Sequence, residues 1–167
     1  NILRNLSEPD VTQKILGIFK KEINKLTLKD LDFKDLCKKK FISDSQPYLS
    51  SRKKIFYHPK KSVFNLISGD SKFEIEFCEY LDSFDDVISF YKNDIQLKQY
   101  IEYVKHDGTI GSYFPDFFIK LSNGDRWVVE TKGAEGINDP RKIERLKIWC
   151  EDATRLHGIS WKSLYIR

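Results

Sequence analysis

The 167-residue chain is long enough to form one domain with a substantial core. Its 29 basic and 25 acidic side chains give a formal net charge of +4, which allows a nucleic-acid partner without requiring one. No apolar run approaches the roughly 18 residues needed to cross a bilayer, and there is no signal-peptide pattern. We therefore expect a soluble, cytoplasmic domain, and the absence of methionine indicates a segment of a longer polypeptide.

Cysteine usage adds no metal site or disulfide framework. Cys37, Cys78 and Cys150 are widely spaced and odd in number. Cys78 and Cys150 fall in helical patterns, so we interpret them as core residues.

The first fifty residues are predicted to form a helical segment. A helix-start signature at residues 7–10 precedes apolar residues at helical spacing, and Thr27 predicts a second helix start. A polar break around Pro47 separates this region from the rest. We therefore expect an N-terminal helical segment at residues 1–50, able to contact a domain outside this chain, and a single domain at residues 51–167.

The domain at residues 51–167 is predicted to be α/β, with a central mixed β-sheet flanked by helices. Ser71 with Glu74 three residues later predicts a helix start, and a basic helix begins at Asp139 and ends before Gly158. Short strands are expected at residues 55–57, 62–67, 87–91, 101–104 and 159–166, with a turn at 68–70.

The region from residue 115 to residue 132 is the most informative. Pro115-Asp116 opens one apolar run, Glu130-Thr131-Lys132 closes another, and a turn signal at residues 122–125 lies between them. A hairpin would bring Asp116 beside Glu130, and alternation along a strand would place Glu130 and Lys132 on one face. Two carboxylates and an ammonium would then converge.

This combination suits a divalent metal ion and an attacking water. Hard oxygen ligands hold Mg²⁺, which supplies positive charge for phosphodiester hydrolysis and lowers the pKa of a bound water. A nearby lysine orients the water or stabilises the transition state. Glu74, in the first turn of its helix, is the best candidate for a third carboxylate.

Pro115-Asp116 with Glu130-Thr131-Lys132 resembles the motif of the PD-(D/E)xK nuclease superfamily. More narrowly, the last hundred residues resemble the C-terminal endonuclease domain of the restriction (Res) subunit of type III restriction–modification enzymes. The matching segments are 71–77 with Leu81, 113–117, 129–133, and 149–153 leading to Gly158 and Trp161.

The resemblance implies a restriction-endonuclease-like fold and a Mg²⁺-dependent endonuclease for double-stranded DNA, in which Mn²⁺ substitutes. It also implies a prokaryotic cytosolic location, a helicase-like ATPase region of the same polypeptide and a methyltransferase (modification) subunit as partners. Neither a Walker A loop nor any helicase motif occurs in these 167 residues.

The same resemblance assigns roles to individual residues. Asp116 and Glu130 would be metal ligands, with the Thr131 backbone carbonyl as a further ligand. Lys132 would orient the water or stabilise charge, and Glu74 would act through a metal-bound water.

DNA contacts are expected from two places. The basic helix offers Arg141, Lys142, Arg145 and Lys147 for phosphate groups. A solvated basic face, balanced by acidic residues of the same helix, is an equally weighted interpretation. Ser112 and Tyr113, which precede Asp116, are further candidates for contacts with the substrate backbone.

Two other classes of function stay open. The domain could bind nucleic acid without catalysis, or it could be a protein-interaction module of a larger complex. Mg²⁺-dependent nicking of plasmid DNA separates the enzyme from both, and salt-dependent DNA binding by an Asp116→Ala variant separates the two from each other.

Overall fold

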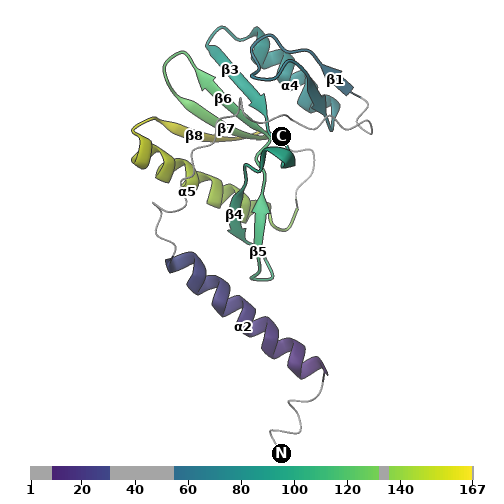
Figure 1. Cartoon of the computed structure of the whole chain (residues 1–167), viewed down its shortest axis with the longest axis vertical. Coiled ribbons are helices and arrows are strands. Elements are labelled where there is room, and N and C mark those ends of the chain that lie inside the picture. Colours follow the sequence, from purple (N-terminus) through teal and green to yellow (C-terminus); the bar gives the residue numbers. More distant parts are fainter. Residues whose placement is uncertain (1–8, 31–54, 132–135, 167) are drawn as a thin grey trace, which may run out of the picture.

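A computed structural model of the chain describes residues 9–30, 55–131 and 136–166. Figure 1 shows a central sheet with a helix on each side and one long helix beyond it. The predicted α/β class, with a mixed sheet flanked by helices and an N-terminal helix, is confirmed. None of the described helices is both long and apolar enough to cross a membrane.

The central sheet has four strands in the order β3-β6-β7-β8. Strand β6 pairs antiparallel with both β3 and β7, whereas β8 runs parallel to β7. Gly124, at φ 92°, makes the tight turn between β6 and β7, where a side chain would be strained. The strands are β3 (Val87–Lys92), β6 (Phe117–Leu121), β7 (Arg126–Thr131) and β8 (Trp161–Ile166).

One face of the sheet packs against helix α4 (Lys72–Ser83) and the hairpin of β1 (Ile55–Tyr57) and β2 (Ile67–Gly69). Ser71 caps α4 as predicted, because its hydroxyl accepts a hydrogen bond from the Glu74 backbone N–H at 3.2 Å. The buried core on this face consists of Ile67, Ile75, Cys78, Leu81, Val87, Phe90, Phe117, Ile119 and Val129.

The other face packs against helix α5 (Asp139–His157) and the hairpin of β4 (Ile101–Val104) and β5 (Ile110–Tyr113). A short 3₁₀ helix, η2 (Ile95–Leu97), connects β3 to this hairpin. Gly158, at φ 64°, ends α5 as predicted. The buried core here consists of Ile101, Tyr103, Tyr113, Val128, Leu146 and Cys150.

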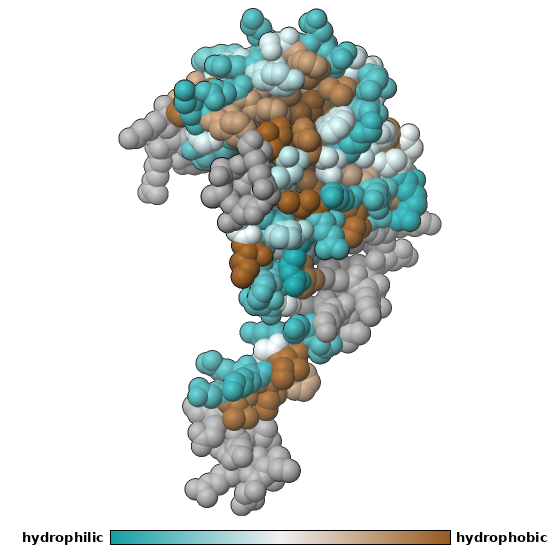
Figure 2. All heavy atoms as spheres, turned by 180° about the vertical axis from the view of Figure 1, so that it is seen from behind, coloured by the Kyte–Doolittle hydropathy of each residue, from teal (hydrophilic) through white to brown (hydrophobic). Residues whose placement is uncertain are grey.

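Helix α2 (Pro9–Asp30) lies outside these layers. It is one helix of 22 residues, so the predicted second helix start at Thr27 is wrong. Apolar side chains are exposed along it, as the brown atoms on the lower part of Figure 2 show. They include Leu16, Ile18, Phe19 and Ile23. The predicted domain boundary at residue 50 lies outside the described residues.

Two local predictions differ from the structure. The strand expected at 62–67 and the turn expected at 68–70 are replaced by β2 at Ile67–Gly69. The preceding segment is instead bonded to β3, where the Val63 N–H donates to the Phe90 carbonyl at 2.9 Å. Tertiary pairing with β3 therefore overrides the local apolar pattern.

Candidate active site

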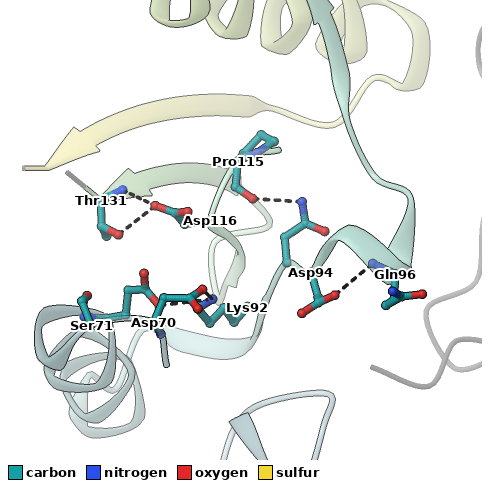
Figure 3. A network of polar contacts seen from close by, with 10 residues as sticks. Asp70, Ser71, Lys92, Asp94, Gln96, Pro115, Asp116 and Thr131 are labelled. Atoms are coloured by element: carbon teal, nitrogen blue, oxygen red, sulfur yellow. Dashed lines mark hydrogen bonds and ion pairs between the residues drawn. The ribbon is translucent and has the colours of Figure 1, made fainter. Parts of the chain in front are cut away.

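Asp116 lies where strands β6 and β7 separate. The register pairs Phe117 with Val129, so one further step places Asp116 opposite Glu130. The Asp116 Oδ2 atom accepts hydrogen bonds from the Thr131 backbone N–H at 2.7 Å and from the Thr131 hydroxyl at 2.8 Å (Figure 3). The carboxylate thus bonds to the end of β7 at the point where the ladder with β6 stops.

Asn93 holds the Pro115-Asp116 segment from the side of β3. Its backbone N–H donates to the Asp116 carbonyl at 2.7 Å, and its Nδ2 donates to the Pro115 carbonyl at 3.0 Å. Pro115 would come opposite Thr131 on a continued ladder, but it has no N–H to offer. The proline therefore cannot donate to the β6–β7 ladder, and Asn93 holds this segment through the Pro115 and Asp116 carbonyl groups.

Glu130 is buried on the face of the sheet that packs against α5. Val128, two residues earlier, belongs to the core of that face, and Glu130 shares its side of the strand. The Tyr113 hydroxyl donates a hydrogen bond to Glu130 Oε2 at 2.9 Å. Burial, and then the charges of Glu130 and Asp116, raise the pKa of Tyr113, so this hydroxyl stays a donor and lies near both carboxylates.

Glu74 reaches the site from the opposite face, where α4 begins. Its Oε2 atom lies 3.2 Å from the Lys92 ammonium and accepts the Asp70 backbone N–H at 2.9 Å. The same ammonium lies 3.3 Å from Asp70 Oδ2 (Figure 3). Burial disfavours the charged form of Lys92, but Glu74 and Asp70 outweigh this and raise the pKa of the ammonium.

The pKa of the Asp116 carboxyl depends on burial and on three neighbouring residues. Burial raises the pKa of its carboxyl and the two bonds from Thr131 lower it, while the charge of Glu74 raises it and that of Lys92 lowers it, for a net rise. The Asp116 carboxyl is therefore the element that connects the Glu74–Lys92 pair with the Tyr113–Glu130 pair.

The oxygen atoms of this site are of the kind that magnesium prefers as ligands. Both hydrogen bonds that Thr131 donates to Asp116 go to the Oδ2 atom. Within the described ranges, no hydrogen bond to the Oδ1 atom is present. No three His, Cys, Asp or Glu side chains of the described residues are grouped closely enough to hold a metal ion by themselves. Mg²⁺ is commonly bound by one or two carboxylates and keeps several waters, so Asp116 and Glu130 are the residues of this site that would hold one.

The other predicted site residues have varied positions. Lys132 lies outside the described residues. On α5, Arg141 and Lys147 are exposed, whereas Lys142 pairs with Asp139 at 3.2 Å and lies 5.8 Å from the centre of the Tyr113 ring. The Nε of Arg145 donates to the Glu102 carbonyl at 3.2 Å.

Two predicted DNA-contacting residues on β5 point in opposite directions. Ser112 is exposed, whereas the Tyr113 ring is only 4% exposed and lies in the core beneath α5. Tyr113 thus offers little surface to a DNA backbone, and its hydroxyl is committed to Glu130.

The sequence pattern does not single out Lys92, Asp70 or Asn93 as site residues. One sequence signal at Lys92 resembles that at Glu130. In both places a charged residue comes at the end of an apolar strand and is followed by a polar residue, Asn93 or Thr131. The predicted strand ends at Tyr91, one residue before the lysine.

A family model described as an endonuclease domain matches residues 60–163, which is more than half of the chain. The chain therefore belongs to this endonuclease-domain family, and the fold agrees with a restriction-endonuclease-like nuclease domain. Comparison with curated proteins and with solved structures yields no match.

Proposed function

We propose that this domain is a PD-(D/E)xK endonuclease that hydrolyses phosphodiester bonds of double-stranded DNA with Mg²⁺, and that Mn²⁺ substitutes for it. The observation that carries the proposal is the cross-strand placement of Asp116 and Glu130 at the end of the β6–β7 ladder. Membership of an endonuclease-domain family supports the same reaction class.

Asp116 and Glu130 would hold the metal ion, together with the Thr131 backbone carbonyl. Bound Mg²⁺ neutralises charge on the scissile phosphate and lowers the pKa of a bound water. Thr131 donates two hydrogen bonds to the Asp116 carboxylate, and Tyr113 donates one to that of Glu130, so both proposed ligands are oriented by neighbouring groups. Lys132 would orient the attacking water or stabilise the charge of the transition state, and Glu74 would act through a bound water.

The wider context is also part of the proposal. We infer a type III-like restriction system in the prokaryotic cytosol, with a helicase-like ATPase region in the same polypeptide and a methyltransferase subunit as partner. The exposed apolar side chains of α2 support contact with another protein domain.

The test is nicking of supercoiled plasmid DNA with Mg²⁺ or Mn²⁺. We expect Asp116→Ala, Glu130→Ala and Lys132→Ala each to abolish cleavage without loss of cooperative thermal unfolding. Glu74→Ala should slow cleavage less, because its link to the metal is indirect. Glu79→Ala is the matched control, since Glu79 is an exposed glutamate of the same helix.

Two results would contradict the proposal. One is wild-type activity in a folded Lys132→Ala variant. The other is the absence of cleavage by the wild-type domain with either metal ion, which would favour the alternative of a non-catalytic nuclease fold.

A further inference from the structure

Lys92 ends strand β3, and most of its side chain is shielded from solvent. Its side chain is only 9% exposed, and its ammonium lies within 3.3 Å of carboxylate oxygens of both Glu74 and Asp70. Burying an ammonium is costly unless it is paired, so this position requires its acidic partners.

The backbone of β3 places this ammonium next to the proposed metal ligand. Lys92 pairs with Phe117, the residue after Asp116, and the next residue on β3 donates its N–H to the Asp116 carbonyl. The positive charge of Lys92 lowers the pKa of the Asp116 carboxyl, whereas the negative charge of Glu74 raises it. Lys92 therefore lies within electrostatic reach of the Asp116 carboxylate.

The two carboxylates that pair with Lys92 differ in their exposure to solvent. Glu74 is held by two bonds, one to the ammonium and one to the Asp70 backbone N–H, and its side chain is 13% exposed. Asp70 is 55% exposed. Glu74 is thus the more buried of the two carboxylates that pair with Lys92.

From this geometry we propose that Lys92 is a positioning residue of the proposed active site, which holds Glu74 beside Asp116 and sets the affinity of the site for divalent cations. The ammonium offsets negative charge next to Asp116, so a cation meets a less negative site than its carboxylates alone would form. The inference rests on the proposed function, since it takes Asp116 as a metal ligand.

The experiment measures Mn²⁺ binding to the DNA-free domain by calorimetry and, separately, DNA cleavage at saturating Mn²⁺. Lys92→Met should bind Mn²⁺ about tenfold more tightly, because a positive charge near the ion is removed. It should nevertheless cleave more slowly, because Glu74 is no longer held. Lys92→Arg keeps the charge and should restore both quantities toward wild type.

Lys72→Met is the matched control. Lys72 is an exposed lysine of α4 that pairs with Glu76, and its removal changes the net charge by the same amount. We expect its Mn²⁺ affinity and its cleavage rate to equal those of the wild type. A tightening in both lysine variants would show a nonspecific charge effect and overturn the inference.

Unchanged or weaker Mn²⁺ binding by folded Lys92→Met would also overturn the inference. If that variant does not unfold cooperatively, Mn²⁺ binding is measured instead on Glu74→Gln, because this change leaves the Lys92 ammonium without its glutamate partner. Mn²⁺ should then bind about tenfold more weakly, and unchanged binding would contradict the inference. Failure of the proposed function is distinct, because the wild type itself would then neither bind Mn²⁺ nor cleave.

Discussion

Tyr113 illustrates how a single hydroxyl can position a buried carboxylate, that of the proposed metal ligand Glu130. Its ring lies in the core between β5 and α5, and its O–H donates to the Glu130 carboxylate. A hydrogen bond to a charged acceptor contributes about 1.5–3 kcal/mol, and groups that orient metal ligands affect metal affinity through them. The role of Tyr113 at this position is to hold Glu130.

Tyr113→Phe is therefore expected to weaken Mn²⁺ binding roughly tenfold while leaving the ring packing intact. Calorimetric titration of the DNA-free protein measures this. Tyr91→Phe is the control, because its hydroxyl bonds to Gln99 instead of a carboxylate. Equal Mn²⁺ affinities for Tyr113→Phe and the wild type would contradict the proposed role of Tyr113 in metal binding.

Among the contacts between elements, Asp82 joins the end of α4 to the segment after β1. Its carboxylate accepts the Tyr57 hydroxyl at 2.7 Å and the backbone N–H groups of Lys60 and Lys61 at 2.8 Å each. Burial works against the charged form of Asp82, but these bonds outweigh it and lower the pKa of the carboxyl. The charged carboxylate is thus the stabilising form.

Asp82→Asn should lower the free energy of unfolding by about 2 kcal/mol at neutral pH, because the amide is a weaker acceptor. The folded-state pKa lies below the unfolded value, so the stabilisation is present above pH 3.8 and is lost as the pH falls through the folded pKa. Urea unfolding from pH 7 to pH 3 should show the two proteins converging. Asp85→Asn, at a neighbouring exposed position, is the control, and a pH-independent difference would contradict the argument.

The junction between α5 and β8 depends on Thr154. Its hydroxyl accepts the Trp161 N–H at 2.8 Å and donates to the Cys150 carbonyl at 2.8 Å. The side chain therefore fixes the start of β8 against the last turns of the helix, and β8 is the strand that pairs with β7 along its whole length.

Thr154→Val keeps the shape but removes both bonds, so we expect a loss of about 1–3 kcal/mol in the free energy of unfolding. Thr154→Ser keeps the hydroxyl and should retain most of the stability. Chemical denaturation of the three proteins tests this. Equal stability of the valine and wild-type proteins would mean that water replaces the hydroxyl.

For the molecule as a whole, the distribution of charge matters more than the net charge of +4. Arg141 and Lys147 are exposed on α5, while Lys142 and Arg145 already bond to Asp139 and to Glu102. Arg141 and Lys147 are therefore available to phosphate groups, whereas Lys142 is paired within α5 and Arg145 bonds to strand β4.

Replacing Arg141 or Lys147 by alanine in an Asp116→Ala background should weaken DNA binding uniformly across sequences. The slope of log affinity against log salt should fall by about 0.9 for each phosphate group that the variant no longer neutralises. Fluorescence anisotropy at several salt concentrations measures this. Lys162→Ala is the control, because Lys162 pairs with Asp125 near the β6–β7 turn. Unchanged slopes for both α5 variants would favour the solvated basic face.

Local patterns predict some features of this fold well and others poorly. The α4 cap, the β6–β7 turn and the end of α5 follow from a few neighbouring residues and are confirmed. The buried side of α4 is harder to predict from local spacing, because its buried residues are Ile75, Cys78 and Leu81 and not its aromatic residues. Tyr80 and Phe84 instead pack on each other at the surface, with ring centroids 5.5 Å apart.

Neighbouring residues alone specify the hairpin that carries Asp116 and Glu130, because strand alternation and a turn signal are local properties. The meeting of Lys92 with Glu74, of Asn93 with Pro115 and of Tyr113 with Glu130 depends instead on the packed fold. The Asn93–Pro115 and Tyr113–Glu130 contacts join residues that are 22 and 17 positions apart. The Lys92–Glu74 contact joins strand β3 to helix α4. The packing of α4 and of the β4–β5 hairpin on the sheet determines which of these residues meet, and no local sequence pattern specifies that packing.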